Sequence, residues 1–145
     1  MLNLMYKNDR MCKLSDNHFK KKFLIVEDDQ SVRDVLTSML RSVIGEIDEI
    51  YTAESGEKAV ELAKRMTFYG VLTDMQMPGM DGLDTFRELK KINPTTTIVI
   101  MTGYANQERI DAALKEGAAD CLMKPFTMAD LKAMLEKKLK NRIER

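Results

Sequence analysis

Hydrophobic positions follow two periodicities from Phe23 onward. Short apolar runs, typical of strands buried on both faces, occur at residues 23–26, 47–52, 70–73, 97–101 and 119–123. Between these runs, apolar residues recur every three or four positions, which indicates helices with one buried stripe. The stripes span residues 32–43, 59–66, 83–92, 110–114 and 128–139. The pattern therefore predicts five strands that alternate with five helices.

Short connections between alternating strands and helices are typical of one fold class. They predict an α/β protein with a doubly wound, five-stranded parallel sheet and helices on both faces. In such sheets, ligands bind beyond the carboxyl ends of the strands, where the strand order reverses. The residues that directly follow the strands are therefore the first place to look for chemistry.

The length and composition fit a single globular domain. The chain has 145 residues, of which 44% are hydrophobic and 32% charged. We place the domain at residues 23–141, after a flexible N-terminal extension at 1–22 and before a C-terminal tail at 142–145. The extension has only scattered apolar residues, so it does not resemble a signal peptide.

Charge and residue counts narrow the range of functions. The 23 basic and 23 acidic residues cancel, so nothing draws the whole chain to nucleic acid or to a membrane surface. No apolar run approaches the roughly 18 residues of a membrane span. Cys12 and Cys121 lie far apart, which favours a reducing compartment, and we expect the cytoplasm. The single histidine, His18, lies in the extension, which argues against a histidine-based metal site or triad.

Charged and hydroxyl side chains follow four of the predicted strands. They are Glu27, Asp28 and Asp29 after the first strand, Asp74 after the third, Thr102 after the fourth and Lys124 after the fifth. Two unit charges about 4 Å apart repel by about 4 kcal/mol at an effective dielectric of about 20, so clustered carboxylates need a counter-charge. Lys124 supplies one positive charge, and Mg²⁺ suits a site of carboxylates and phosphate oxygens.

Each of these residues, taken singly, also has a structural interpretation. Asp29 or Ser31 could cap the first helix, and Asp81 could cap the third. Helix capping accounts neither for Asp74 at a strand end nor for the Lys124–Pro125 step. The set as a whole therefore favours a functional cleft.

Four motifs, each after a predicted strand, resemble the receiver domain of two-component response regulators. They are FLIVEDD at 23–29, LTDMQMPGMDG at 72–82, MTGYA at 101–105 and KPF at 124–126. The resemblance extends from Phe23 to about Lys140. It implies the flavodoxin-like receiver fold with strand order 2-1-3-4-5.

The resemblance also implies a phosphoacceptor site with Mg²⁺ as its cofactor. Asp74 would accept a phosphoryl group from a histidine kinase or a histidine phosphotransfer protein. The implied metal ligands are Asp28, Asp74, the backbone carbonyl of Gln76 and, through a water molecule, Glu27. A carboxylate nucleophile of this kind forms an acyl phosphate.

A phosphorylation-dependent switch follows from the same resemblance. Thr102 would hydrogen-bond the phosphoryl group, Lys124 would pair with one of its oxygens, and the Lys124–Pro125 peptide would be cis. The added charge would shift the face made by the fourth helix, fifth strand and fifth helix, which the family uses for its protein targets. A phosphorylation-dependent dimer is compatible with this scheme.

Several positions depart from the commonest family pattern or tune it. Cys121 stands where the family usually has Tyr or Phe. In the family, that aromatic ring commonly changes rotamer together with the threonine, so this part of the switch is in question here. The simpler interpretation of Cys121 is a small buried hydrophobe. Glu27 replaces a more frequent Asp.

Gln76 and Tyr104 occupy positions that modulate phosphoryl lifetime in the family. We hypothesise that they screen or orient the water molecule that attacks the phosphoryl group. The alternative is that both are plain surface residues.

Competing functions fit the sequence less well. A flavin-binding protein would place a phosphate where Glu27, Asp28 and Asp29 would repel it. A small Mg²⁺-dependent phosphatase usually carries its nucleophile on the first strand. A phosphorylation-independent binding module would not need the full set of Asp28, Asp74, Thr102 and Lys124. We expect either a stand-alone receiver or a fragment of a longer regulator. Its only chemistry would be self-phosphorylation from a phosphodonor and slow self-dephosphorylation.

Overall fold

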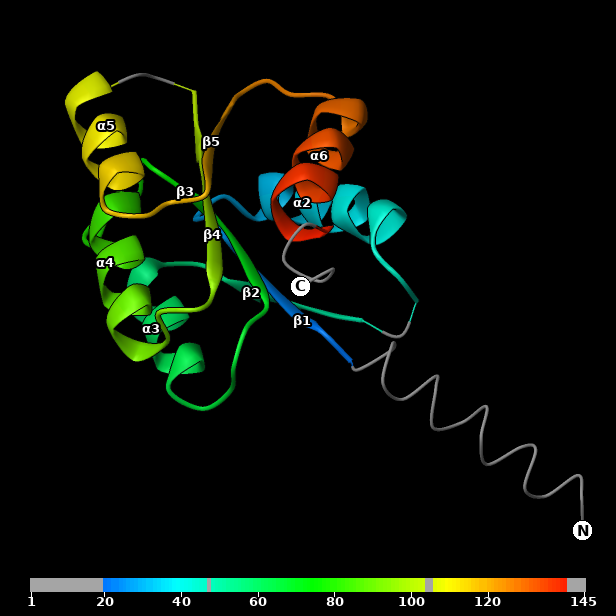
Figure 1. The fold of residues 1–145 in the computed structure, drawn as a ribbon, viewed down its shortest axis with the longest axis horizontal. Helices are drawn as coiled ribbons and strands as arrows, with labels where there is room; N and C mark the ends of the chain where they lie inside the picture. The colour runs from blue at the N-terminus through cyan, green and yellow to red at the C-terminus, as the bar shows by residue number, and fades with distance from the viewer. Residues whose placement is uncertain (1–19, 47, 104–105, 141–145) are drawn as a thin grey trace, which may run out of the picture.

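The computed structural model describes residues 20–46, 48–103 and 106–140, which form a parallel sheet with helices on both faces (Figure 1). The strands are β1 (Lys22–Val26), β2 (Glu49–Ala53), β3 (Gly70–Asp74), β4 (Thr97–Thr102) and β5 (Asp120–Met123). Their order across the sheet is β2-β1-β3-β4-β5, and every pair is parallel. The predicted fold class and strand order are thus confirmed.

Helices connect successive strands and cover both faces of the sheet, and a last helix follows β5. They are α2 (Gln30–Val43), α3 (Gly56–Ala63), α4 (Gly82–Ile92), α5 (Gln107–Lys115) and α6 (Met128–Leu135), with a π-helical turn at Glu136–Lys140. Figure 1 shows α3, α4 and α5 on one side of the sheet and α2 with α6 on the other. None of the helices in the described ranges is long and apolar enough to cross a membrane.

The sheet register brings the carboxyl ends of the strands to one edge. Val26 pairs with Thr73, so the residues after β1 lie next to the end of β3. Asp74 pairs with Met101, one residue before the end of β4. Thr102 in turn pairs with the last residue of β5. Side chains that follow β1, β3 and β5 therefore converge, as the sequence pattern predicts.

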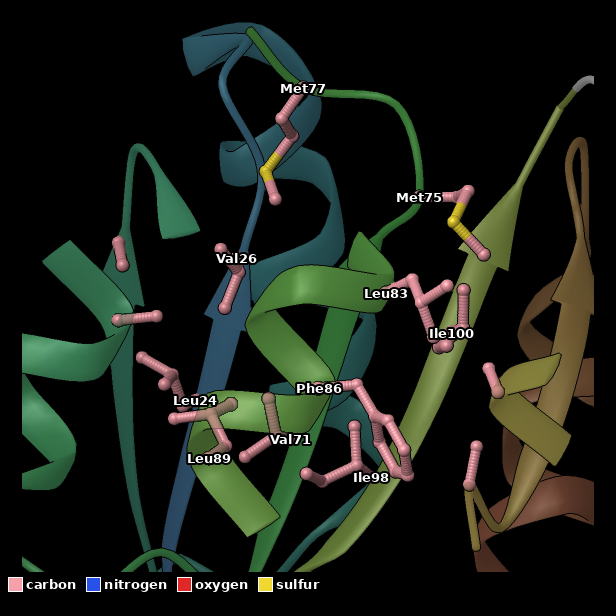
Figure 2. Close-up of a cluster of buried hydrophobic side chains, with 14 of the residues drawn as sticks. Leu24, Val26, Val71, Met75, Met77, Leu83, Phe86, Leu89, Ile98 and Ile100 are labelled. Atoms are coloured by element: carbon pink, nitrogen blue, oxygen red, sulfur yellow. The ribbon is translucent and has the colours of Figure 1, made fainter. Parts of the chain in front are cut away.

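Two apolar clusters hold the helices on the sheet, one on each face. Successive strand residues point to opposite faces, so each buried strand contributes to both clusters. The cluster beneath α3, α4 and α5 contains Leu24, Val26, Val71, Ile98, Ile100, Leu83, Phe86 and Leu89, among others (Figure 2). The opposite cluster contains Phe23, Ile25, Leu72, Val99, Met101, Leu36, Leu40 and Leu131. Burial on both faces is why these strands have continuous apolar runs.

Side-chain caps define where several helices begin. The carboxylate of Asp29 accepts a hydrogen bond from the Val32 amide, so Asp29, and not Ser31, caps α2. Asp81 caps α4, as predicted. A capping box of Thr127 with Asp130 opens α6.

Some sequence-based details differ from the structure. Val35, Ile92, Leu114 and Met128, which we assigned to buried helical stripes, are exposed. Successive helical residues are about 100° apart, so a residue beside a buried neighbour easily lies at the edge of the stripe or outside it. β1 begins at Lys22, one residue before the predicted domain start. The rest of the predicted extension, residues 1–19, and residues 141–145 lie outside the described residues.

Gly82 brings α4 into backbone contact with the end of β3. A Cβ atom at this position would lie 2.5 Å from the carbonyl oxygen of Asp74 and 2.6 Å from the Cα of Met75. The Gly82 amide donates a hydrogen bond to the carbonyl of Met75 at 2.9 Å. The obstructing atoms belong to the main chain and cannot rotate away, so glycine is needed here.

Replacing Gly82 by alanine should therefore destabilise the fold. We expect Gly82→Ala to lower the free energy of unfolding by about 1–3 kcal/mol, because the extra methyl group forces the backbone apart. Gly45→Ala is the matched control, since its Cβ would make only an ordinary 3.4 Å contact with Asp48. That control should stay within about 1 kcal/mol of the parent. Chemical denaturation measures both, and equal effects would contradict the close-approach argument.

Candidate functional site

Three carboxylates meet at the carboxyl edge of the sheet. Glu27 and Asp28 directly follow β1, and Asp74 is the last residue of β3. One oxygen from each carboxylate lies within 4.8 Å of the others. Glu27 and Asp74 are buried, with 2% and 7% of their surfaces exposed, whereas Asp28 faces solvent. The cluster is thus open to solvent at Asp28.

Lys124 brings a positive charge to this cluster from the segment after β5. Its Nζ lies 2.9 Å from Oε1 of Glu27 and 3.4 Å from Oδ1 of Asp74. Partial burial alone would lower the pKa of the ammonium group, but the hydrogen bond to Glu27 and the charges of Asp74 and Glu27 outweigh it and raise the pKa. Lys124 therefore remains protonated throughout the neutral range.

One ammonium group does not neutralise three carboxylates. The pKa of Asp28 is raised by burial, by its hydrogen bond with Glu27 and by the charges of Glu27 and Asp29. The ionised form of Asp28 is therefore disfavoured by its surroundings. A divalent cation with a preference for oxygen ligands would relieve this excess charge, and the donor set of Glu27, Asp28 and Asp74 fits Mg²⁺.

Thr102 and Lys124 are linked through the main chain. The Lys124 amide donates to the Thr102 carbonyl at 2.8 Å, which extends the β4–β5 pairing past the end of β5. The Thr102 side chain is fully buried at the end of β4. The Lys124–Pro125 peptide is cis, as the family resemblance implied. Asp28, Asp74, Thr102 and Lys124 thus all lie at the same edge of the sheet.

The remaining sequence-predicted residues are Gln76, Tyr104 and Cys121. Gln76 is exposed in the loop between β3 and α4, and its role as a carbonyl ligand stays a prediction. Tyr104 lies outside the described residues. Cys121 is half-buried in β5 and packs against the cluster beneath α3, α4 and α5. Burial and the charge of Asp120 raise the pKa of its thiol, which fits the interpretation of Cys121 as a small hydrophobe.

Two arginines near the site were missed by sequence reasoning. Arg33 donates hydrogen bonds from Nη1 to the main-chain carbonyls of Glu27 and Asp28. Arg109 of α5 forms a 2.6 Å ion pair with Asp81, the cap of α4. One sequence feature could have pointed to Arg33: it lies near the N-terminal end of a predicted helix, where the helix dipole disfavours a cation.

Comparisons with known proteins agree with this geometry. Residues 23–136 match the family model described as the response regulator receiver domain. The transcriptional regulatory protein ZraR of Escherichia coli K12 is 39% identical over 122 residues, which make up 84% of this chain and 27% of ZraR. The chain thus spans about a quarter of the length of that regulator.

Solved structures show the same fold. A response regulator receiver domain protein from Clostridium thermocellum has a TM-score of 0.77 and 29% identity, covering 84% of this chain and 96% of that one. The receiver domain of the sensor histidine kinase PA1611 from Pseudomonas aeruginosa PAO1 has a TM-score of 0.72 and 28% identity, covering 83% and 98%. That structure has a magnesium ion coordinated in its active-site cleft.

Fold, acidic cluster and family match together define the class of this protein. A five-stranded receiver fold with a carboxylate cluster and a lysine at the sheet edge is the phosphoryl-accepting module of two-component signalling. The chain belongs to the response regulator receiver domain family.

The acidic cluster predicts a specific response to Mg²⁺. In the presence of a chelator, Asp28→Asn should raise the melting temperature, because one of three repelling carboxylates becomes neutral. Mg²⁺ should raise the melting temperature of the parent, and much less that of the variant, since the variant lacks one ligand. Thermal unfolding followed by circular dichroism measures both effects.

Asp34→Asn provides the control for this experiment. Asp34 is an exposed aspartate of α2 outside the carboxylate cluster, so its substitution should change neither the melting temperature in chelator nor the response to Mg²⁺. A parent protein that Mg²⁺ does not stabilise would contradict the assignment of the cluster as a metal site.

Proposed function

We propose that this protein is a phosphorylation-dependent signalling switch. Asp74 accepts a phosphoryl group from the phosphohistidine of a histidine kinase or a histidine phosphotransfer protein. The observation that carries this proposal is the position of the Asp74 carboxylate, which lies 3.4 Å from the Lys124 ammonium group and within the carboxylate cluster. A donor histidine on the partner is consistent with the lack of histidine among residues 20–145.

The phosphoryl transfer requires little covalent chemistry from the protein. An Asp74 oxygen forms a bond to phosphorus as the bond between phosphorus and the donor nitrogen breaks. Catalysis then depends on positioning and on neutralising the charge of the phosphoryl oxygens. Lys124 is placed to pair with one oxygen, and the Thr102 hydroxyl is placed to hydrogen-bond another. Mg²⁺, when bound by Asp28 and Asp74 and through water by Glu27, supplies the remaining positive charge.

The phosphoryl group changes the balance of charge around Lys124. It adds up to about two negative charges beside an ammonium group that pairs with both Glu27 and Asp74. Lys124 is joined to Thr102 through the main chain, so a shift of either residue moves the end of β4 and the start of the loop toward α5. This loop and helix are the proposed moving parts.

The proposed output surface is the face formed by α5, β5 and α6. Leu114 on α5, Met123 on β5 and Met128 on α6 are large apolar side chains that remain exposed, between 41% and 53% of their surfaces. Exposed apolar residues on neighbouring elements suit a protein partner. That partner is a downstream protein or, after phosphorylation, a second copy of this chain. We expect no direct contact with nucleic acid or membrane, and a cytoplasmic location.

We further propose that the chain acts through protein contacts and is not a turnover enzyme. Self-phosphorylation and slow hydrolysis of the acyl phosphate are its only reactions, with Gln76 and Tyr104 tuning the hydrolysis. A small Mg²⁺-dependent phosphatase is the alternative, and steady release of phosphate from a phosphomonoester would favour it. The chain works either alone or as the receiver of a longer regulator. Comparing the protein partners that it binds with those of the full gene product distinguishes the two.

Phosphorylation of Asp74 is directly testable by intact mass spectrometry. Incubation with a small phosphodonor and Mg²⁺ should add one phosphoryl group to the parent protein. Asp74→Ala should remain unmodified, because the nucleophile is gone, and chelation of Mg²⁺ should slow the parent's reaction by about 100-fold or more.

Asp34→Ala is the matched control, since it removes a carboxylate that lies outside the cluster. It should be phosphorylated at the parent's rate. Continued phosphorylation of Asp74→Ala at one site would show that another residue is the acceptor and would overturn the proposal.

A further inference from the structure

The guanidinium group of Arg33 binds the main chain on both sides of Asp28. Its Nη1 atom lies 2.7 Å from the carbonyl oxygen of Glu27 and 3.2 Å from that of Asp28. Its Nη2 atom donates to Oε1 of Gln30 at 3.3 Å. The two carbonyls belong to the peptide planes that flank the Cα of Asp28. A single donor that binds both carbonyls restricts the two backbone dihedrals of Asp28.

Helix formation does not require this arrangement. Asp29 already caps α2 through the Val32 amide, and the Arg33 amide already donates to the Asp29 carbonyl at 2.9 Å. An arginine side chain loses rotamer entropy when it is fixed. A cation near a helix N-terminus is also disfavoured by the helix dipole. The hydrogen bonds to the acidic turn are what offset these costs.

The neighbouring acid, Glu27, is held by other groups. Its Oε1 accepts from Lys124 at 2.9 Å, its Oε2 accepts from the Asp29 amide at 3.1 Å, and its own amide donates to the Ala53 carbonyl. Asp28 differs, because its side chain is exposed and its hydrogen-bond partner is Glu27, another acid whose charge repels it when both are ionised. The direction of the Asp28 carboxylate therefore depends strongly on its backbone conformation.

We propose that Arg33 is a positioning residue for the metal site. It holds the backbone on both sides of Asp28, and thereby keeps the Asp28 carboxylate within reach of a cation shared with Asp74. The inference rests on the proposed function, because it assumes that this cluster binds Mg²⁺. Groups that orient metal ligands without touching the metal typically change metal affinity 10- to 100-fold.

Because Arg33 is positively charged, the possible roles of this residue predict different directions of change in Mg²⁺ affinity. A guanidinium cation repels Mg²⁺, so its removal should strengthen Mg²⁺ binding if charge were its only influence. A purely structural role would leave the affinity unchanged once the variant is folded. Only the positioning role predicts weaker binding.

The experiment compares Mg²⁺ binding by isothermal titration calorimetry in the parent and in variants. Arg33→Ala should bind Mg²⁺ about tenfold more weakly than the parent. Arg33→Lys keeps the charge but cannot reproduce the guanidinium geometry, so its affinity should fall between the two.

Arg41→Ala is the matched control on the same helix. Arg41 also donates from Nη1 to two main-chain carbonyls, those of Gly45 and Asp48, but at the opposite end of α2. Arg41→Ala should lose a stability comparable to that lost by Arg33→Ala, and it should keep the parent's Mg²⁺ affinity. Unchanged or tighter binding by Arg33→Ala, or parent affinity in Arg33→Lys, would overturn the inference. A parent that binds no Mg²⁺ would instead contradict the proposed function itself.

Discussion

Repulsion among three carboxylates is the constraint around which this structure is organised. Glu27, Asp28 and Asp74 lie within 4.8 Å of one another because parallel pairing brings the ends of β1 and β3 together. Lys124, which follows β5, relieves part of that repulsion. The excess charge that remains makes the edge receptive to a metal cation. The fold thus stabilises a locally unfavourable arrangement, as is common at functional sites.

The same lysine connects charge to conformation. Its ammonium group binds Glu27 and Asp74, while its amide binds the end of β4. Because Lys124 contacts both the Asp74 carboxylate and the end of β4, a chemical change at Asp74 can be transmitted through Lys124 to β4. In the proposed switch, this double attachment is the route by which phosphorylation of Asp74 would act beyond the cleft.

Most of the fold could be predicted from the sequence because burial leaves a periodic signature. The runs at Phe23–Val26 and Ile98–Met101 are apolar throughout and buried on both faces, which identified central strands. The prediction that Val35 is buried was wrong, because the sequence pattern does not distinguish a residue beside the buried stripe from one within it. Clustering of Asp28 and Asp74 was predictable from topology. The hydrogen bonds of Arg33 were not, since contacts between side chains and carbonyls have no period.

Gly82 has a mechanical consequence for the acceptor strand. A methyl group at the start of α4 would not fit beside the carbonyl of Asp74, so no free space separates the start of α4 from the end of β3. Within the sheet, β3 is flanked by β1 and β4, and β5 is the edge strand beyond β4. Close packing of this kind does not deform continuously. We therefore expect the end of β3 and the start of α4 to move together as one unit, and relative motion to occur elsewhere in the domain.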